Sequence, residues 1–439
     1  MSSELPDLPD GWQYLPLNTC SEAASISYGI VQPGRHVGGG VPIIRVNNFR
    51  GTHLDFTELM RVDSGIEAKY SRTRLKGGEV LLSIVGSIGQ VAIAPEEIIG
   101  FNVARAVAVI SPLPHIGPEW VALCLRSPLS QYLLGSRANT TVQTTINLKD
   151  LRTLPIPIPP QRERRAITSI IASLDDRIAL LRETNKTLES IAQAIFKSWF
   201  VDFDPVRAKM EGRQPEGMNE ETAALFPDSF GEAELGLVPH GWRIGCLANI
   251  AKVHKAQLRP DDIPAGTNYV GLEHIPRKSI SFDSWGCADE VQSAKATFSR
   301  GDILFGKLRP YFHKVVIAPI DGVCSTDILV YRPVTDYHFG FAALHLSSDT
   351  LIDYASRLSN GARMPRVGWK DLAAYPIVVP SAPCARAFND IFQVISDRMM
   401  VNVHRMRHLA SLRDTLLPRL ISGRLRLPEA TVVPQEACP

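Results

Sequence analysis

The sequence contains one long pattern twice, and this repeat limits the possible folds more than any other feature. Lys149-Asp150-Leu151 precedes an apolar run bounded by prolines at 155–159, and Lys370-Asp371-Leu372 precedes a matching run at 376–380. The offset of 221 residues (370 − 149) continues through the following positions, and it drifts slightly upstream. Solenoid repeats have periods of about 20–50 residues, so this is a duplicated globule and helix with internal pseudo-two-fold symmetry. Two related surfaces in one chain predict a target that also has two parts.

Composition excludes several other classes of protein. The 439 residues are 45% hydrophobic and 21% charged, which is typical of a soluble protein with roughly two to four domains. No apolar run reaches the length of about 18 residues that a membrane span needs. The N-terminus has no signal-peptide pattern, and the seven cysteines form no C-x-x-C pair. We therefore expect reduced thiols, a cytoplasmic location, no membrane and no zinc site.

Net charge is only +2, but charge is distributed unevenly. Residues 386–426 contain eight arginines and three aspartates. A locally basic face is compatible with phosphate contact, and it is equally compatible with an ordinary solvated helix surface. Charge alone therefore leaves nucleic-acid binding open.

Each half of the chain begins with strand-rich sequence. Short β-branched runs stand between glycine, asparagine and proline, and they predict strands near 41–44, 80–85, 90–93 and 106–110, and again near 302–305, 313–318 and 327–331. Apolar spacing predicts helices over 118–134 and 339–357. Both halves are therefore expected to be α+β globules.

Each half then closes with a long helix. A seven-residue row is formed in the first by Ile167, Leu174, Leu181, Leu188 and Ile195, and in the second by Phe388, Ile395, Asn402, Leu409 and Leu416. These rows predict two helices that pack on each other as an antiparallel coiled coil, with Asn402 as a polar residue that fixes the register. Pro159-Pro160 precedes the first helix, Pro205 is expected to end it, and Ser422-Gly423 is expected to end the second.

The predicted fold class is thus α+β, with two globules joined by a pair of long helices. The expected segments are a first globule at 1–158, a first helix at 159–204, a linker at 205–238, a second globule at 239–380, a second helix at 381–426 and a tail at 427–439. The linker is expected because residues 205–238 are rich in proline, glycine and glutamate.

Sequence motifs for catalysis are lacking. Residues 301–307 match the glycine and lysine spacing of a phosphate-binding loop. Leu308 stands where that motif needs Ser or Thr, and Pro310 would break the helix that should follow. We find no H-E-x-x-H, no G-x-S-x-G and no glycine-rich cofactor fingerprint. The chain is therefore expected to have no catalytic residue, no metal site and no cofactor of its own.

Three strings at the ends of the helices carry a family resemblance. They are residues 195–205 (IFKSWFVDFDP), residues 225–230 (LFPDSF) and residues 416–423 (LLPRLISG). With the order globule, proline-led helix, globule, helix, they closely resemble the specificity (S) subunit of type I restriction–modification systems over nearly the whole chain. One departure is that the first helix opens with Pro159-Pro160-Gln161, whereas the second opens with Pro380-Ser381 and lacks the glutamine.

The resemblance implies a function that the residues alone do not show. Each globule would be a target-recognition domain for one half of a bipartite, asymmetric site in double-stranded DNA, and the helical pair would set the gap between the halves. Two modification subunits, which are adenine-N6 methyltransferases, would dock on the helical region, and restriction subunits would complete the complex. S-adenosylmethionine, ATP and Mg would belong to those partners.

Candidate DNA contacts are polar and basic side chains in turn-rich segments, because base edges and phosphates need such groups. In the first half they are Arg45, Asn47, Asn48, Arg50, Ser87, Gln90, Asn139, Thr141 and Gln143. In the second half they are Lys307, Arg309, Tyr311, His313, Asn360, Arg363 and Arg366. Candidate partner-binding residues are Phe200, Phe203, Leu416, Leu420 and Ile421, as apolar groups near the helix ends.

Two alternatives remain open. The chain could be a coiled-coil scaffold that joins two protein-binding globules, in which case binding would be indifferent to salt, unlike phosphate contact. A free-standing nuclease or methyltransferase would require turnover by the chain alone, and we expect none.

Overall fold

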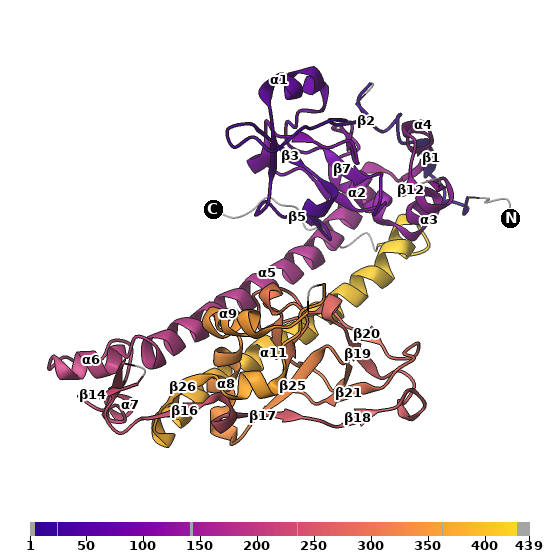
Figure 1. The fold of residues 1–439 in the computed structure, drawn as a ribbon. Helices are drawn as coiled ribbons and strands as arrows, with labels where there is room; N and C mark the ends of the chain where they lie inside the picture. Colours follow the sequence, from indigo (N-terminus) through magenta and orange to yellow (C-terminus); the bar gives the residue numbers. More distant parts are fainter. Residues whose placement is uncertain (1–4, 24, 141–143, 235, 362, 428–439) are drawn as a thin grey trace, which may run out of the picture. The chain divides into compact units, whose positions relative to one another are not determined.

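The computed structural model describes residues 5–23, 25–140, 144–234, 236–361 and 363–427. Its contacts divide the chain into two compact units (Figure 1). Unit 1 comprises Met1–Asp176 and Ala410–Pro439, and unit 2 comprises Arg177–Leu409. Two helices of 40 residues each, α5 (Gln161–Phe200) and α11 (Ala382–Ile421), contribute residues to both units. The predicted long helices are confirmed, and the second begins at Ala382.

Unit 1 is built on two small sheets. The four-stranded antiparallel sheet has the order β2 (Ser27–Tyr28), β10 (Val107–Ile110), β7 (Val80–Ser83), β8 (Val91–Ile93). The three-stranded sheet has the order β6 (Met60–Val62), β3 (Val41–Ile44), β9 (Asn102–Val103), with β3 and β9 parallel. Hairpins and ladders complete it: β1 (Gln13–Pro16) with β13 (Pro155–Ile158), β4 (Phe49–Arg50) with β5 (His53–Leu54), and β11 (Asn139–Thr140) with β12 (Thr144–Thr145).

The helices of unit 1 are α1 (Ser64–Glu67), α2 (Pro118–Arg126), α3 (Pro128–Ser136) and α4 (Leu148–Arg152), with a 3-10 segment η2 (Ala68–Thr73) after α1. The single helix expected over 118–134 is therefore two helices. Ser127 ends α2 and its side chain accepts a hydrogen bond from the Ser130 amide that begins α3. Pro128 follows, and since it has no amide hydrogen it favours a helix start.

The central strand β7 is buried on both faces, which explains why its sequence is a continuous apolar run. Val80 and Leu82 face a core shared with α2, with Ile167 and Ile171 of α5, and with the end of α11. Leu81 faces the other way, into a core shared with the three-stranded sheet. One strand thus stabilises two layers because successive side chains point to opposite faces.

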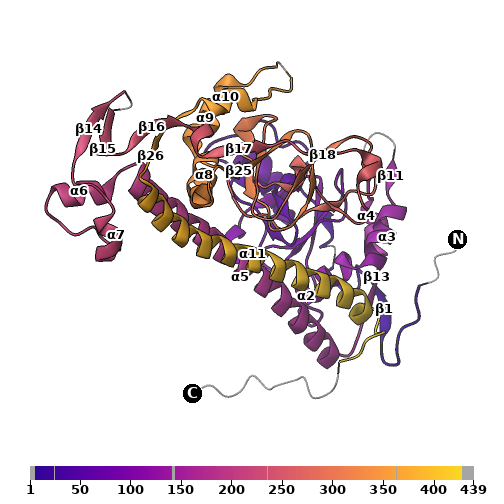
Figure 2. The same ribbon diagram turned by 90° about the horizontal axis from the view of Figure 1, so that it is seen from below.

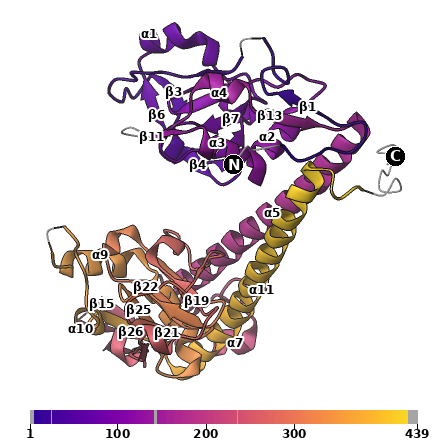
Figure 3. The same cartoon turned by 90° about the vertical axis from the view of Figure 1, so that its right-hand side faces the viewer.

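Unit 2 repeats this plan (Figure 3). Its four-stranded antiparallel sheet has the order β17 (Ala251–His254), β25 (Ile328–Pro333), β22 (Ile303–Gly306), β23 (Val315–Ile317). Its second sheet has the order β18 (Gln257–Leu258), β21 (Lys295–Phe298), β24 (Gly322–Cys324), β19 (Asn268–Val270), β20 (Gly286–Cys287), in which β19 and β24 are parallel. β16 (Arg243–Cys246) pairs with β26 (Pro376–Val379). The helices are α8 (Phe339–Leu346), α9 (Asp349–Leu358) and α10 (Trp369–Ala373).

The duplication is therefore one of topology. The ladder β1–β13 corresponds to β16–β26, the sheet β2-β10-β7-β8 corresponds to β17-β25-β22-β23, and the parallel pair β3–β9 corresponds to β19–β24. Ser348 caps α9 as Ser127 caps α3. Unit 2 differs by the additional strands β18 and β21. The expected α+β class and internal repeat are confirmed.

The helices α5 and α11 pack antiparallel within each unit (Figure 2). In unit 1, Arg413 of α11 makes an ion pair of 2.7 Å with Asp175 of α5. In unit 2, Asn402 of α11 donates to Asn185 of α5, and Phe388 packs against Trp199. The residues in contact are numbered in opposite order on the two helices, as the predicted antiparallel coiled coil requires.

Residues 205–238 are not the linker that their composition predicts. They contain α6 (Asp204–Met210), α7 (Glu220–Ala224) and the hairpin β14 (Phe230–Ala233) with β15 (Gly236–Pro239), gathered at the end of α5 in unit 2 (Figure 2). Phe226 is buried between Trp199 and Trp242. Two buried aromatic contacts outweigh the local preference for irregular chain. The first helix accordingly ends at Phe200, before Pro205, which lies in the first turn of α6.

Candidate nucleic-acid interface

The structure brings two separate candidate segments of unit 2 together. The turn 307–314, which joins β22 to β23, lies beside the loop 360–367, which joins α9 to α10. The Val367 amide donates to the Lys307 carbonyl at 3.2 Å, and the Arg309 amide donates to the Pro365 carbonyl at 2.8 Å. Asn360 and Arg366 exchange backbone hydrogen bonds of 3.0 and 2.9 Å across the loop. We call these two segments the loop pair of unit 2.

Unit 1 has the same loop pair in its turn 84–91 and its hairpin β11–β12. The Ile146 amide donates to the Ile84 carbonyl at 3.0 Å, and the Gly86 amide donates to the Thr144 carbonyl at 3.0 Å. Within the hairpin, Asn139 pairs with Thr145, as Asn360 pairs with Arg366. The two loop pairs thus share a backbone hydrogen-bond scheme while their side chains differ.

Cationic side chains are held in place on the loop pair of unit 2. The Arg366 guanidinium donates to both carboxylate oxygens of Asp327, at 2.8 and 3.1 Å, and these bonds hold the pKa of Asp327 below its ordinary value. Arg309 donates from Nη2 to the Arg363 carbonyl at 3.1 Å. The Tyr311 ring is 54% exposed and stands edge-on to Phe312. Guanidinium groups and an exposed ring on one surface suit phosphate oxygens and base edges.

The backbone of this surface is strained. Arg309 and His313 both have φ of +51°, a left-handed conformation that non-glycine residues rarely adopt. The corresponding positions of unit 1 are Gly86 and Gly89, with φ of +77° and +91°. Unit 2 therefore keeps an arginine where the turn geometry favours glycine. Such strain persists where the surrounding structure enforces it, and it often marks a functional position.

His313 itself has a structural role. Its side chain is buried, its Nε2 lies 2.8 Å from the Ser347 carbonyl, and its Nδ1 lies 3.3 Å from a carboxylate oxygen of Asp349. This corrects the prediction that His313 contacts DNA, because both ring nitrogens already have partners. The same correction applies to Asn48, which is 2% exposed. Its Oδ1 accepts from the Arg45 amide, and its Nδ2 donates to the carbonyls of Asp55 and Glu58.

The segment from Arg45 to Arg50 belongs to another part of unit 1. Its hairpin β4–β5 packs near β8 and borders a pocket of about 230 Å³ that is lined also by Glu119, Thr168 and Asp175. Arg50 makes an ion pair of 3.3 Å with Asp55, and Asn47 is exposed. This segment is therefore separate from the loop pair, and its role in DNA binding stays a prediction.

The remaining candidates of unit 1 lie on its loop pair. Ser87 is exposed at the tip of the turn, and its carbonyl accepts a hydrogen bond from Ser83 Oγ at 2.6 Å. Gln90 is half-buried and directly precedes β8. Asn139 lies in β11, whereas Thr141 and Gln143 lie outside the described residues.

Sequence reasoning missed two basic residues beside the loop pair of unit 2. The Arg277 guanidinium lies 4.2 Å from the centre of the Phe312 ring, and the Lys278 amide donates to the His313 carbonyl at 2.9 Å. Lys278 also has a left-handed backbone, with φ of +53°. Both are exposed, and only the fold brings them next to the turn.

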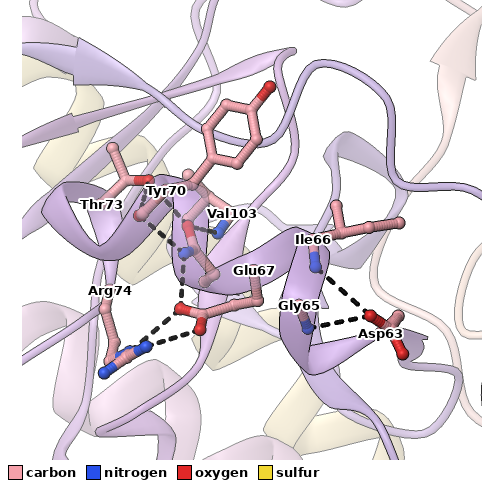
Figure 4. A network of polar contacts seen from close by, with 9 residues as sticks. Asp63, Gly65, Ile66, Glu67, Tyr70, Thr73, Arg74 and Val103 are labelled. Carbon is pink, nitrogen blue, oxygen red and sulfur yellow. Dashed lines mark hydrogen bonds and ion pairs between the residues drawn. The ribbon is translucent and has the colours of Figure 1, made fainter.

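A buried network in unit 1, also unpredicted, fixes the segment α1–η2 (Figure 4). Asn102 is fully buried; it donates to Glu67 Oε1 and to the Tyr70 carbonyl, both at 3.0 Å, and accepts from Thr73 Oγ1 at 2.7 Å. Arg74 bonds both oxygens of Glu67, which lowers the pKa of that carboxyl. Asn102 stands 29 to 35 residues from its three partners, so no local pattern predicts the network.

The predicted partner-binding residues lie in the cores. Phe200 and Phe203 are buried in unit 2 against Trp242. Leu420 and Ile421 are buried in unit 1, and Leu416 packs partly buried against the same core. This corrects the prediction of an exposed apolar surface at these positions, because each unit uses the helix ends to close its own core. Exposed apolar side chains occur elsewhere on the helices of unit 2, at Leu180, Ile191, Ile391, Val394 and Val401.

No helix in the described part of the chain is both long and apolar enough to cross a membrane. No group of three or more His, Cys, Asp or Glu side chains in the described ranges is placed to hold a metal ion.

Comparison with known proteins gives matches to specificity subunits of type I restriction enzymes. Residues 34–190 match the family model for the type I restriction modification DNA specificity domain. The specificity subunit of the type I restriction enzyme EcoBI from Escherichia coli is 32% identical over 43% of this chain, and the match covers 42% of that protein. The HindI specificity subunit from Haemophilus influenzae is 25% identical over 81% of this chain and 88% of its own length.

Among solved structures, the S subunit of the type I restriction–modification system from M. genitalium covers 95% of this chain and 99% of its own length, with a TM-score of 0.52 and 15% sequence identity. At that identity the likeness concerns the fold. The family model ends at residue 190 and so covers only the beginning of unit 2, whereas this likeness in fold spans both units.

Proposed function

We propose that this chain, which belongs to the family of type I restriction–modification specificity subunits, selects a two-part site in double-stranded DNA. Each unit reads one half of the site through its loop pair. The chain itself does no chemistry and supplies sequence selection to catalytic partners.

The observation that supports this most strongly is the repeated loop pair. The same backbone hydrogen bonds join 84–91 to 139–146 in unit 1 and 307–314 to 360–367 in unit 2. Side chains at matching places differ: Gly86 against Arg309, and Thr145 against Arg366. A repeated scaffold with different side chains is what two readers of different half-sites require, because base edges are distinguished by the donors and acceptors presented to them.

Roles follow from the chemistry of each side chain. In unit 2 we propose Lys307, Arg309, Tyr311, Asn360, Arg363 and Arg366 as the contact residues, joined by Arg277 and Lys278. Lysines supply phosphate contacts, whereas Arg309, Arg363 and Asn360 suit bidentate contacts with guanine and adenine respectively. The Arg366 guanidinium already bonds both oxygens of Asp327, so we assign Arg366 to phosphate contact. In unit 1 we propose Ser87, Gln90, Asn139, Thr141 and Gln143, which are neutral hydrogen-bonding residues. Unit 2 is therefore expected to provide more of the salt-dependent part of the affinity.

The modification subunits, expected as two copies, are proposed to dock on the exposed apolar residues of α5 and α11. Ile391, Val394 and Val401 have the spacing of one helix face, and Val394 is 72% exposed. Exposed apolar groups in a row mark a protein interface more often than isolated ones do. Restriction subunits would complete the complex, and S-adenosylmethionine, ATP and Mg would be bound by these partners.

The test is methylation of a random-sequence DNA library by the chain assembled with its modification subunits. Sequencing of methylated adenines is expected to show one motif of two parts separated by an unspecified gap. Replacement of the loop pair of unit 2 is expected to change one part and leave the other intact. A library without any preferred sequence, or a change in both parts, would refute the proposal and favour a scaffold that binds proteins.

The scaffold alternative differs also in its response to salt. Phosphate contacts release counterions, so affinity for DNA should fall steeply as salt is raised. Fluorescence anisotropy with a labelled duplex that carries the mapped site measures this slope. Binding that is unchanged over a fourfold range of salt would exclude phosphate contact.

A further inference from the structure

A pocket of unit 1 lies between α2 and α5, apart from the loop pair. Its volume is about 230 Å³, and its walls come from the hairpin β4–β5, β8, α2 and α5. Ile93, Leu123 and Ala172 supply apolar surface to it, and His53 adds an exposed imidazole at its border. Drug-sized ligands occupy pockets of about 300–1,000 Å³, so this smaller space suits one large side chain. We call it the α2–α5 pocket.

Carboxylates predominate among the charged groups of this pocket. It is lined by one guanidinium, that of Arg126, and by the three carboxylates of Glu119, Asp175 and Asp176. Arg126 Nη1 lies 3.9 Å from Asp175, which also pairs with Arg413 at 2.7 Å. The charges of Arg126 and Asp175 therefore offset each other within unit 1, and two carboxylates are left over.

The two remaining carboxylates, Glu119 and Asp176, are available to a ligand. Both are exposed, and neither has a hydrogen bond or an ion pair with any described residue. Their charge repels phosphate, so the pocket is not a seat for the DNA backbone. They are not arranged for a metal ion either, because no three His, Cys, Asp or Glu side chains of the described ranges are placed to hold one. The pocket fits an organic cation.

An arginine side chain meets both requirements of the pocket. Its methylene stem can cover the apolar wall while its head stays at the polar rim. Its guanidinium presents donors in a fork that matches carboxylates, and such charge-assisted hydrogen bonds are stronger than neutral ones. Lysine has the same charge, but its ammonium is more strongly hydrated and forms no fork. Arginine is also enriched among the few residues that dominate binding at protein interfaces.

Unit 2 closes the corresponding space with a side chain of its own. The offset of 221 residues places Glu119 on Gly340 and Ile171 on Phe392. Phe392 is buried, and a Cβ at position 340 would lie 2.6 Å from its ring, so α8 packs directly on α11. In unit 1 the pocket leaves apolar surface in water, and the buried Nε of Arg126 has no partner among the described residues. Both features cost stability, and a less stable arrangement kept in one copy only points to a function.

The basic occupant has to come from another chain. The residues outside the described ranges are 1–4, 24, 141–143, 235, 362 and 428–439, and their sequence contains no lysine, arginine or histidine. The described basic side chains make no contact with Glu119 or Asp176. This chain therefore has no further basic side chain that could fill the pocket.

We infer that the α2–α5 pocket receives one arginine side chain of a modification subunit, held by Glu119 and Asp176. The inference rests on the proposed function for the identity of the partner, and it adds a docking site that only one unit provides. Because unit 2 has Gly340 and Phe392 at the matching positions, only one of the two modification subunits gains this contact. The two docking sites of the chain are therefore unequal.

The first experiment tests the pocket in the full chain without partners. N-acetyl-arginine methylamide is titrated into protein with labelled isoleucine and leucine methyl groups, and N-acetyl-citrulline methylamide serves as the uncharged control of the same shape. The methyl resonances of Ile93 and Leu123 are expected to shift with the arginine compound and about tenfold more weakly with the citrulline compound. In Glu119→Gln/Asp176→Asn both compounds should bind equally weakly.

The second experiment measures assembly with the modification subunits by analytical ultracentrifugation. Glu119→Gln/Asp176→Asn is expected to weaken the binding of one of the two copies by about tenfold or more, so that complexes with a single modification subunit accumulate. Ala172→Leu, which keeps the carboxylates and narrows the pocket, should have the same effect. Glu96→Gln/Glu97→Gln is the matched control, because both carboxylates are exposed in unit 1 and do not line the pocket; it should assemble as the wild type does.

The outcomes separate this inference from the proposed function. Equal binding of the two compounds, unchanged assembly of Glu119→Gln/Asp176→Asn, or an equal loss in the control variant would each overturn the inference. Loss of self-association of the chain with unchanged assembly would assign the pocket to a second copy and would also overturn it. Variant complexes saturated with modification subunits should methylate the same two-part motif as the wild type. A wild-type library with no two-part motif would instead remove the proposed function, and the titration would still decide whether the pocket binds arginine.

Discussion

Replacing Arg309 with glycine separates the reading role of this residue from its effect on stability. Arg309 occupies a left-handed conformation, φ +51°, where unit 1 has Gly86. Relief of that conformation should stabilise the folded state by about 1 kcal/mol. The greater freedom of glycine in the unfolded chain and the lost bond to the Arg363 carbonyl together cost a similar amount. The free energy of unfolding of Arg309→Gly should therefore stay within about 1 kcal/mol of the wild type.

Binding should respond very differently. A side chain that makes a bidentate contact with a base provides about 1–3 kcal/mol of discrimination, which is about 5–150-fold in affinity. We expect Arg309→Gly to lose that preference at one position of one half-site, and to leave the other half-site unchanged. The assay is fluorescence anisotropy with the assembled complex on duplexes that carry the mapped site and its single-base variants, at fixed salt.

Arg309→Lys is the matched variant, because it keeps the charge and the backbone conformation. If Arg309 contacts a base, the lysine variant should lose most of the preference, since an ammonium cannot reproduce the planar fork of a guanidinium. If Arg309 contacts phosphate, the lysine variant should bind as the wild type does, and the glycine variant should lower the salt slope by about one. A folded Arg309→Gly complex whose affinity and salt slope both match the wild type would refute the reasoning.

Four other predictions concern the stability of the units and their assembly with partners. Burial raises the pKa of Glu189 above the ordinary carboxyl value of 4.5, so the folded state binds the proton more tightly than the unfolded state. This carboxyl therefore lowers the free energy of unfolding as pH rises above 4.5. Chemical denaturation should show Glu189→Gln to be more stable than the wild type at pH 7 but not at pH 4. The effect of Glu67 on stability has the opposite pH dependence, because Arg74 lowers the pKa of this carboxyl. Its stabilising contribution is present at neutral pH and is lost in acid, so the stability of Glu67→Gln should fall less on acidification than that of the wild type. An equal fall in both proteins would contradict this prediction. Phe200→Ala should destabilise the chain by about 3–5 kcal/mol in thermal unfolding. Val394→Asp should leave stability unchanged and should weaken assembly with the modification subunits in analytical ultracentrifugation. Assembly equal to that of the wild type would remove Val394 from the proposed interface.

The sequence was sufficient for the duplication, the two long helices and most of the strands. Periodicity of seven is robust because both helices keep one apolar face along their whole length. For residues 205–238 the composition predicts a linker, because proline, glycine and glutamate favour irregular chain locally. The observed order of this region comes from Phe226, which packs between Trp199 and Trp242. A contact between an aromatic residue and a helix more than twenty positions away leaves no local pattern.

The candidate site was predictable in part for a similar reason. Lys307, Arg309 and Arg366 could be chosen because polar residues in turns are ordinary candidates for DNA contact. His313 and Asn48 satisfied the same criterion, and only the structure shows that their hydrogen bonds are used internally. Residue type predicts the capacity to form a hydrogen bond, and burial decides whether that capacity remains available.

The loop pairs also explain how the two units can share a scaffold while their side chains differ. The bonds that define each loop pair run between backbone groups, from Ile146 to Ile84 and from Val367 to Lys307, and they make no demand on side chains. Side chains at these positions are consequently free to differ, even to the extent of arginine in place of glycine at a left-handed turn. A scaffold held by its backbone permits a new half-site to be selected by substitution without repacking of the core. By the same reasoning, changes of specificity should concentrate in 307–314 and 360–367.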